Sequence, residues 1–378
     1  MKKFFLFGYF GRNNFGDDLM LISLLRHIPK NKYKKIVLSG NSNFSNKIRD
    51  FDTIIYPRTV FNFFKSLFQC TDFVLTGGSW FHDNYKKNPD KINFLIKIIL
   101  LTVSLIFLRF LNKKVILLGI SIGPFSSNSI IKFFSYLSIY FSNTILLRDK
   151  KSLSEIKLMN KNFLQKAILG KDLVELISQD FNTKLSGNKN YLGISIINLE
   201  QFKNNENIYD SEIYKKLVNK ISKILIQKKK LKIKVFALWT PKDKNINDVH
   251  ESRKFINLFD KKFKNRFELI EYKNNYKSFL KEMIKCKYMI STRLHSFLAA
   301  YYLKQNCNVI VYNRKCADAA KHLFISKKRL LFLNKINDEN SISKWFNFLF
   351  KNNLSPKSEF DSNLKKKINN CLGIKFSQ

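Results

Sequence analysis

The chain has 378 residues, of which 45% are hydrophobic, and this excludes a disordered protein and allows two α/β domains with separate cores. Lysine and arginine outnumber aspartate and glutamate by 68 to 28, so the formal net charge is +40. Such a surface attracts phosphorylated substrates, anionic lipid headgroups or nucleic acid, although the coding bias of an AT-rich genome is an alternative source of the lysines.

The first sixteen residues, MKKFFLFGYFGRNNFG, hold an apolar run that glycines interrupt before a signal-peptide core could form. We expect a buried strand over Lys3–Gly8, a glycine-rich loop over Tyr9–Asp17 and an amphipathic helix over Asp18–Ile28. The loop matches neither G-x-G-x-x-G nor a phosphate-binding P-loop, because no Lys-Ser/Thr pair follows its last glycine.

Glycines in this loop allow a ligand to approach the backbone closely, and its polar side chains supply hydrogen-bonding groups. Asp17 and Asp18 are either ligand-facing or simply helix caps. The loop residues that we expect at a binding site are Gly11, Asn14, Gly16, Asp17 and Asp18.

Further strands are predicted over Ile36–Gly40, Thr53–Tyr56 and Asp72–Thr76. Gly77-Gly78 follows the last of them, at the strand end where open α/β sheets bind ligands. His82 and Asp83 are either polar groups of that site or caps of the next segment.

Ile92–Leu111 is the most apolar stretch of the chain. Lys97 and Arg109 leave an uncharged run of residues 98–108, which we expect to be too short to span a bilayer. A buried helix, or an interfacial helix resting on an anionic cytoplasmic leaflet, is the better interpretation.

Val115–Ile122 reads as a buried strand and Thr144–Leu147 as a shorter one, followed directly by Arg148. We expect Arg148 at a solvent-facing strand end, where it either binds a ligand or pairs with Asp149. Residues 1–180 form the predicted first domain, and polar Ser178–Asn190 forms the linker.

The second domain, residues 191–340, repeats the alternation of strand and helix. Its predicted strands are Tyr191–Ile197, Lys232–Leu238, Phe267–Glu271 and Asn308–Tyr312. Its predicted helices are Ser211–Gln227, Val249–Phe259 and Tyr276–Ile284. Residues 341–378 are a helical tail, in which Ile342–Phe350 is expected to fold back on the first domain. The fold class is therefore α/β, with two doubly wound, Rossmann-like parallel sheets facing a cleft.

Residues 286–303, CKYMISTRLHSFLAAYYL, combine a strand with a strongly helical stretch. With Thr292 as N-cap, Arg293 and His295 lie beside unpaired N–H groups and the positive end of the helix dipole. Arg293 offers a planar fork for phosphate or carboxylate, and His295 can transfer a proton near neutral pH. Alternatively, Arg293 pairs with a carboxylate and His295 caps or packs.

Five cysteines are scattered without close pairs, which favours a reducing compartment, the cytoplasm: Cys70, Cys286, Cys307, Cys316 and Cys371. No cluster of metal ligands is apparent, and we expect no cofactor. No zinc finger or RNA-binding signature accompanies the positive charge, so nucleic acid is an unlikely partner.

The order of motifs GYFGRNNFGDD, LTGGSWFHD, LGISIGP, LLRDKKS, GISI, ISTRLHSFLAA and VYNRK resembles the polysaccharide pyruvyl transferase family. The resemblance covers the chain from about Phe4 to Lys315, and N-x-G-D and S-x-R-L-H are its most specific parts. It implies a GT-B-like fold, phosphoenolpyruvate as donor and a pyruvate ketal on a sugar of a surface polysaccharide or its lipid-linked precursor. Carried over to this sequence, it implies a phosphoenolpyruvate site lined by Arg148, Arg293, Leu294 and His295.

The residues fit that chemistry. Phosphoenolpyruvate is a small anion, so several cations should converge on it, as Arg148, Arg293 and Lys315 could do. His295 is the candidate general acid and Asp17 or Asp18 the candidate base. A nucleotide-sugar glycosyltransferase of the same fold and a non-catalytic basic protein that binds membranes or nucleic acid remain alternatives.

Overall fold

The computed structural model describes residues 1–83, 88–125, 129–176, 191–199, 210–241, 247–333, 338–351 and 362–374. The chain divides into two compact units. The N-terminal unit comprises Met1–Gly11, Asp17–Ile177 and Phe360–Gln378, and the C-terminal unit comprises Arg12–Gly16 and Ser178–Glu359. The linker predicted over residues 178–190 lies outside the described residues.

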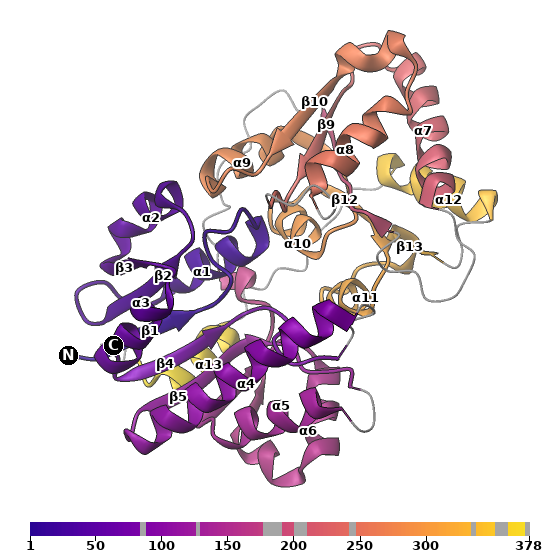
Figure 1. Ribbon diagram of the computed structural model, residues 1–378. Helices are drawn as coiled ribbons and strands as arrows, with labels where there is room; N and C mark the ends of the chain where they lie inside the picture. Colours follow the sequence, from indigo (N-terminus) through magenta and orange to yellow (C-terminus); the bar gives the residue numbers. More distant parts are fainter. Residues whose placement is uncertain are drawn as a thin grey trace. The chain divides into compact units, whose positions relative to one another are not determined.

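The N-terminal unit is built on a parallel sheet with the strand order β3-β2-β1-β4-β5-β6-β7 (Figure 1). Its strands are rich in Val, Ile, Leu and Phe on both faces, as expected of parallel strands that helices cover on both sides. Their bounds are β1 (Lys3–Phe7), β2 (Lys34–Ser39), β3 (Thr53–Pro57), β4 (Asp72–Thr76), β5 (Lys114–Ile120), β6 (Thr144–Leu147) and β7 (Ala167–Leu169).

Helices cover both faces of this sheet. One face packs against a cluster that draws on α3 (Val60–Gln69), α4 (Asn88–Phe110), α5 (Ile130–Tyr140) and α6 (Lys150–Met159). On the other face, α13 (Ser362–Leu372) contacts β5 and β6. The unit also contains α2 (Ser42–Ile48) and most of α1 (Phe15–His27).

The first helix begins at Phe15, three residues before the predicted start at Asp18. Phe15 is fully buried and packs against the rings of Tyr272 and Phe279 of the C-terminal unit, the unit to which Arg12–Gly16 belong. Asp17 and Asp18 therefore lie in the first turn of α1 and are not its caps.

Within α4, residues 91–110 are long and apolar enough to cross a membrane by length and composition, so the prediction that this segment is too short was wrong. The helix nevertheless packs on the sheet, since Ile98, Leu101, Leu105 and Leu108 belong to the core cluster of the N-terminal unit. Of the two predicted alternatives, burial is confirmed for this side of the helix, and an interfacial helix stays a prediction.

The C-terminal unit has a second parallel sheet, with the strand order β10-β9-β8-β11-β12-β13. Its strands are β8 (Tyr191–Ser195), β9 (Lys232–Ala237), β10 (Phe267–Glu271), β11 (Cys286–Ser291), β12 (Asn306–Val311) and β13 (Leu330–Phe332). Its helices are α7 (Asp210–Gln227), α8 (Asp248–Asn257), α9 (Tyr276–Ile284), α10 (Leu294–Tyr302), α11 (Arg314–His322) and α12 (Glu339–Lys351). The predicted fold class of two doubly wound parallel sheets is confirmed.

The tail differs from the prediction. Residues 342–350 lie in α12, whose Trp345 is buried in the core of the C-terminal unit and donates from its indole to Arg329 O at 2.9 Å. The helix that returns to the N-terminal unit is α13, where the Lys114 amine donates to Cys371 O at 3.2 Å.

In both sheets the strand order reverses once. The reversal falls between β1 and β4 in the N-terminal unit and between β8 and β11 in the C-terminal unit. Doubly wound sheets bind ligands outside the carboxyl ends of strands at such a switch point. Gly77-Gly78 follows β4, and Thr292-Arg293-Leu294-His295 follows β11, so both predicted motifs lie at switch points.

Candidate active site

The R-L-H segment is attached to the neighbouring strand β8 by buried hydrogen bonds. The Thr292 N–H donates to Ser195 Oγ at 2.9 Å, and the Thr292 hydroxyl donates to Ser195 O at 2.8 Å. Because its hydroxyl is used in this way, Thr292 does not cap the helix, and Arg293 occupies the N-cap position of α10 instead. The predicted cap at Thr292 was therefore wrong, while His295 does lie in the first turn.

Two serines complete this attachment. The hydroxyls of Ser195 and Ser296 lie 2.8 Å apart, and Ser296 Oγ donates to Arg293 O at 2.7 Å. Both serines are fully buried. The backbone of the motif is thus fixed at the carboxyl ends of β8 and β11.

Arg293 forms a two-bond ion pair with Asp248, the first residue of α8. Arg293 Nε donates to Asp248 Oδ2 at 3.1 Å, and Arg293 Nη2 donates to Asp248 Oδ1. The Asp248 side chain is 1% exposed and the Arg293 side chain 23% exposed, so the predicted alternative, in which Arg293 pairs with a carboxylate, is confirmed with a buried partner. Within the part of the chain that the structure describes, Nη1 of Arg293 makes no hydrogen bond.

The surroundings keep this guanidinium charged. Burial alone would lower the pKa of Arg293, but the Asp248 carboxylate raises it above its ordinary value. Asp248 also accepts the N–H groups of Leu238 and Trp239 at 3.2 and 3.0 Å, and the Arg293 guanidinium lies 5.6 Å from the Trp239 ring centre. The charge and the orientation of Arg293 are therefore both set by residues that follow β9.

The glycine-rich loop of the N-terminus binds to the same strand end. Phe15 N donates to Leu238 O and Thr240 N to Asn13 O, both at 2.9 Å. Asn13 has a left-handed backbone with φ of 54°, and its N–H donates to Asn274 Oδ1 at 3.0 Å. These bonds explain why residues 12–16 belong to the C-terminal unit.

Gly16 lies directly against His295. A Cβ atom at Gly16 would be 1.9 Å from His295 Nδ1 and 2.5 Å from its Cγ, so any side chain there would force the imidazole or the loop to move. Asn14 Oδ1 accepts the Gly16 N–H at 3.1 Å and shapes the turn. The structure thus brings together Asn14 and Gly16 of the first motif with Arg293, Leu294 and His295 of the second.

The two candidate bases differ in accessibility. Asp18 is fully buried, and its Oδ1 accepts the Gly11 N–H at 2.7 Å. Asp18 therefore stabilises the conformation of the loop. Asp17 is half-buried. Gly11 has φ of +64°, a left-handed conformation that favours glycine, and a Cβ there would meet Ser39 Oγ at 2.6 Å. The turn conformation of the loop therefore accounts for glycine at position 11.

Gly77 and Gly78 stand at the switch point of the N-terminal sheet, with φ of +59° and +77°. Gly77 N donates to Leu118 O at 2.8 Å. Nearby, the His82 ring stacks on Phe94 with centroids 5.2 Å apart, and the Asp83 side chain is 3.8 Å from the Lys91 amine. His82 and Asp83 are thus engaged with α4.

Arg148 is buried in a polar network across the strand ends of the N-terminal unit. Its guanidinium donates to Ser121 Oγ, to Ser79 Oγ at 3.3 Å and to Asp172 Oδ2 at 3.3 Å. With 7% of the side chain exposed, it does not face solvent as the sequence suggested. Its predicted partner Asp149 instead accepts from Ser121 Oγ at 2.8 Å and caps α6.

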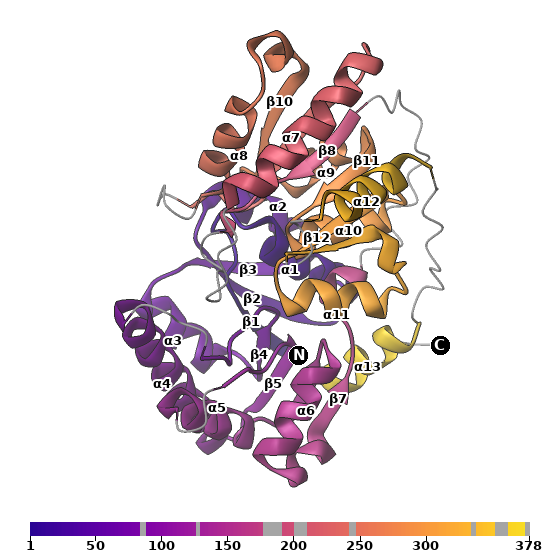
Figure 2. The same ribbon diagram turned by 90° about the vertical axis from the view of Figure 1, so that its right-hand side faces the viewer.

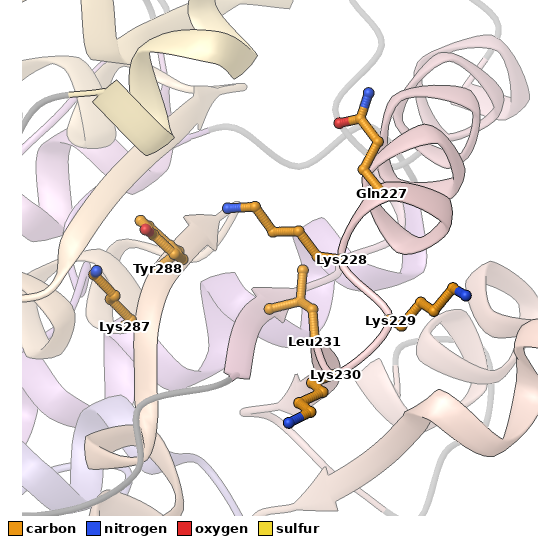
Figure 3. Close-up of a pocket in the computed structure, with 7 residues that line it drawn as sticks. All are labelled: Gln227, Lys228, Lys229, Lys230, Leu231, Lys287 and Tyr288. Carbon is orange, nitrogen blue, oxygen red and sulfur yellow. The ribbon is translucent and has the colours of Figure 1, made fainter.

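Lys315, the third predicted cation, is half-buried in the first turn of α11, after β12. A separate hollow of about 560 Å³ lies at the opposite, amino edge of the C-terminal sheet (Figure 3). It is lined by Gln227, Lys228, Lys229, Lys230, Leu231, Lys287 and Tyr288. It contains none of the predicted site residues. No group of three or more His, Cys, Asp or Glu side chains among the described residues could hold a metal ion.

Several solved structures share this architecture over nearly the whole chain. The UDP-GlcNAc 2-epimerase of Methanocaldococcus jannaschii is 15% identical with a TM-score of 0.61, and coverage is 99% of this chain and 100% of that one. HepE of Anabaena, in complex with UDP and glucose, is 9% identical with a TM-score of 0.56 at the same coverage. The Neisseria meningitidis UDP-GlcNAc 2-epimerase bound to UDP-GlcNAc is 10% identical with a TM-score of 0.55, also at this coverage. At these identities the likeness establishes a GT-B-like fold.

A comparison with curated protein sequences found no match. The family model of polysaccharide pyruvyl transferases matches residues 14–314, which is well over half of the chain. That span begins at Asn14, in the loop that meets His295, and includes the whole R-L-H segment. The chain therefore belongs to the polysaccharide pyruvyl transferase family and is a transferase.

Proposed function

We propose that the protein transfers pyruvate from phosphoenolpyruvate to a sugar of a surface polysaccharide or its lipid-linked precursor, forming a pyruvate ketal. The observation that carries this proposal is the contact of Gly16 with His295. It joins the two most specific motifs of the chain at the switch point of the C-terminal sheet, beside a charged arginine.

The donor's negative charge is matched by the first turn of α10. The unpaired N–H groups of a helix start attract anions, and α10 begins at Leu294, directly after Arg293. Arg293 Nη1 supplies a further donor, while Asp248 holds the rest of the guanidinium in place. Lys315 and Arg148 are proposed as further donor contacts, and for Arg148 this requires competition with Asp172.

The reaction needs acid and base catalysis. Protonation of the methylene carbon of phosphoenolpyruvate makes the adjacent carbon cationic, one sugar hydroxyl attacks it, and a second hydroxyl then displaces phosphate. His295 is the proposed proton donor, because it lies in the same helical turn that binds the anion. Asp17 is the proposed base for a hydroxyl proton, because Asp18 is fully buried.

We place the reaction in the cytoplasm, at the inner face of the membrane, where a lipid-linked acceptor would be presented. The N-terminal unit carries the apolar helix α4 and the chain has a formal net charge of +40, which together suit contact with an anionic leaflet.

Calorimetric titration tests the donor. The full chain is titrated with phosphoenolpyruvate and, separately, with UDP-GlcNAc. We expect heat of binding from phosphoenolpyruvate and a loss of about tenfold or more in affinity for Arg293→Ala, since charge-assisted contacts to phosphate contribute about 1.5–3 kcal/mol. Lys229→Glu, an exposed change at the opposite edge of the sheet, is the matched control and should bind normally. Binding of UDP-GlcNAc without binding of phosphoenolpyruvate would favour the glycosyltransferase alternative.

A further inference from the structure

Helix α4 is apolar on two opposite sides. Its inner side is buried in the core of the N-terminal unit. Its outer side carries a stripe of exposed residues three or four positions apart, which places them on one face of the helix, roughly opposite the buried one. They are Ile92, Ile96, Leu100, Val103, Phe107 and Phe110. Lys97 and Arg109 fall outside this stripe.

The neighbouring helices extend this apolar side. On α3, Val60, Phe61, Phe64 and Phe68 are between 48% and 76% exposed, and the Phe68 ring meets the Phe107 ring edge-on at 5.6 Å. On the other flank, the hydroxyls of Thr102 and Ser138 lie 2.8 Å apart and join α4 to α5, which exposes Ile130 and Phe133. Figure 2 shows the three helices side by side on one face of the sheet.

We call the exposed residues of α3, α4 and α5 named above the outer apolar face. Large apolar side chains that are exposed singly are ordinary, but a contiguous group of this kind marks a surface that binds a partner or a membrane. Four phenylalanines of this face are more than half exposed: Phe61, Phe68, Phe110 and Phe133.

Charge identifies the partner. The sequences of the three helices contain five basic residues and one acidic residue, Asp90. The basic residues are Lys65, Lys91, Lys97, Arg109 and Lys132. A second copy of a chain with a formal net charge of +40 would be repelled by such a face, whereas anionic lipid headgroups would be attracted to it.

We propose that the outer apolar face docks on the anionic leaflet of a lipid bilayer. Helix α4, with 23 residues and a length of about 34 Å, lies in the plane of the interface, its exposed side chains entering the acyl boundary and its lysines contacting headgroups. This surface specifies the membrane contact of the proposed function. The outer apolar face shares no residue with the proposed donor site, so a failure of phosphoenolpyruvate binding would leave this membrane contact unaffected.

Vesicle flotation tests the proposal with the full chain. Vesicles of phosphatidylglycerol and phosphatidylcholine should carry the protein upward, and vesicles of phosphatidylcholine alone should carry at least about tenfold less at low salt. Phe61→Ser with Phe110→Ser should lower partitioning to the anionic vesicles by about tenfold or more, because two inserted aromatic rings are lost. Lys65→Glu with Lys97→Glu should also lower partitioning to the anionic vesicles. This loss should be larger at low salt than at high salt, because salt screens the charges.

Matched controls separate this face from general hydrophobicity and charge. Leu158→Ser with Ile226→Ser removes two other exposed apolar side chains, and Lys229→Glu with Lys230→Glu makes the same charge change in the C-terminal unit. Both controls should float more strongly than the matching face variants. Flotation that is absent, or equal in face and control variants, overturns the proposal. So does sedimentation showing a lipid-free dimer that the two phenylalanine changes dissociate, because the occupant would then be a second copy.

Discussion

The guanidinium of Arg293 has two sets of bonding positions. Nε and Nη2 donate to Asp248, whereas Nη1 makes no hydrogen bond within the described part of the chain and is the position that we propose for the donor. A lysine at this site would keep the charge but could not satisfy the carboxylate and a donor phosphate with a fixed planar fork.

We therefore expect Arg293→Lys to weaken phosphoenolpyruvate binding by about tenfold, equivalent to roughly 1.4 kcal/mol. Calorimetric titration measures this loss. An affinity equal to that of the unchanged chain would show that the fork does not contact the donor.

The partner of Arg293 should matter for stability as well. Asp248→Asn removes the carboxylate charge that compensates a largely buried guanidinium. Breaking buried pairs costs about 3–5 kcal/mol, and since Arg293 is 23% exposed we expect a smaller loss of about 1–3 kcal/mol in the free energy of unfolding. Urea titration followed by fluorescence checks this, with Asp260→Asn, which breaks the exposed pair between Asp260 and Lys262, as a control that should change little.

At His295 the question is whether the side chain transfers a proton or only contributes to binding. His295→Gln keeps hydrogen-bonding capacity but cannot transfer the proton, so turnover should fall by about 10²–10⁴ while donor affinity falls much less. Turnover and titration on the same variant distinguish the two roles. Parallel losses in both would indicate that the imidazole acts in the ground state.

At the scale of elements, the start of α1 and the start of α10 meet through Gly16 and His295. Gly16→Ala adds one methyl group where the imidazole now lies, so the ring or the loop must move. We expect turnover to fall by at least about tenfold. The free energy of unfolding should change less, because alanine favours a helix over glycine by up to about 1 kcal/mol and partly offsets the strain.

Thermal unfolding of Gly16→Ala, measured beside its turnover, separates displacement of His295 from collapse of the loop. The reference is Asn274→Ala, which removes the contact between Asn274 and Asn13 of the loop. If Gly16→Ala lowers the melting temperature as much as Asn274→Ala does, the loop itself is lost. Unchanged turnover would remove Gly16 from the site.

Most strands could be predicted from the sequence because each is a short, nearly continuous apolar run. β4, Asp72–Thr76, and β6, Thr144–Leu147, have the predicted bounds. The start of α1 could not be predicted, because Phe15 is held by Leu238 O and by rings more than two hundred residues away. Local propensity carries no information about such partners.

In the candidate site, too, local motifs could be predicted from the sequence and distant contacts could not. Arg293, His295 and Gly16 were found from short motifs, whereas Asp248, Ser195 and Trp239 were missed. These three act through contacts made only in the folded unit: the ion pair with Arg293, the bonds to Thr292 and the ring near Arg293. Asp248 did carry one signal, since it directly precedes the predicted helix Val249–Phe259, where an acidic residue is common.

At the scale of the whole molecule, all five cysteines are buried as free thiols. Burial raises the pKa of Cys70 to about 11 and the pKa values of Cys307 and Cys371 to about 12, from an ordinary value of 9.0. Because the thiolate is the reactive form, these groups should be inert at pH 8 in the folded protein.

We expect fewer than about one equivalent of thiol to react with a disulfide reagent at pH 8 before unfolding, and all five to react in denaturant. The sign of the pH effect follows from the raised pKa values. The folded state binds more protons than the unfolded state between about pH 9 and 12, so these thiols contribute stability below pH 9 that is lost as the pH rises. Rapid labelling of the native protein would contradict the burial.

The position of α13 also sets an order of events during synthesis. Domains near the N-terminus generally fold first as the chain emerges from the ribosome. Here Leu364, Ile368, Cys371 and Leu372 are buried in the N-terminal unit, and His27 at the end of α1 lies 2.7 Å from Asn369. The face of β5 and β6 that α13 covers thus stays open until more than 350 residues have been translated. During that interval the side chains of β5 and β6 that contact α13 lack their cover, so we expect the N-terminal unit to finish folding only after α13 has been synthesised.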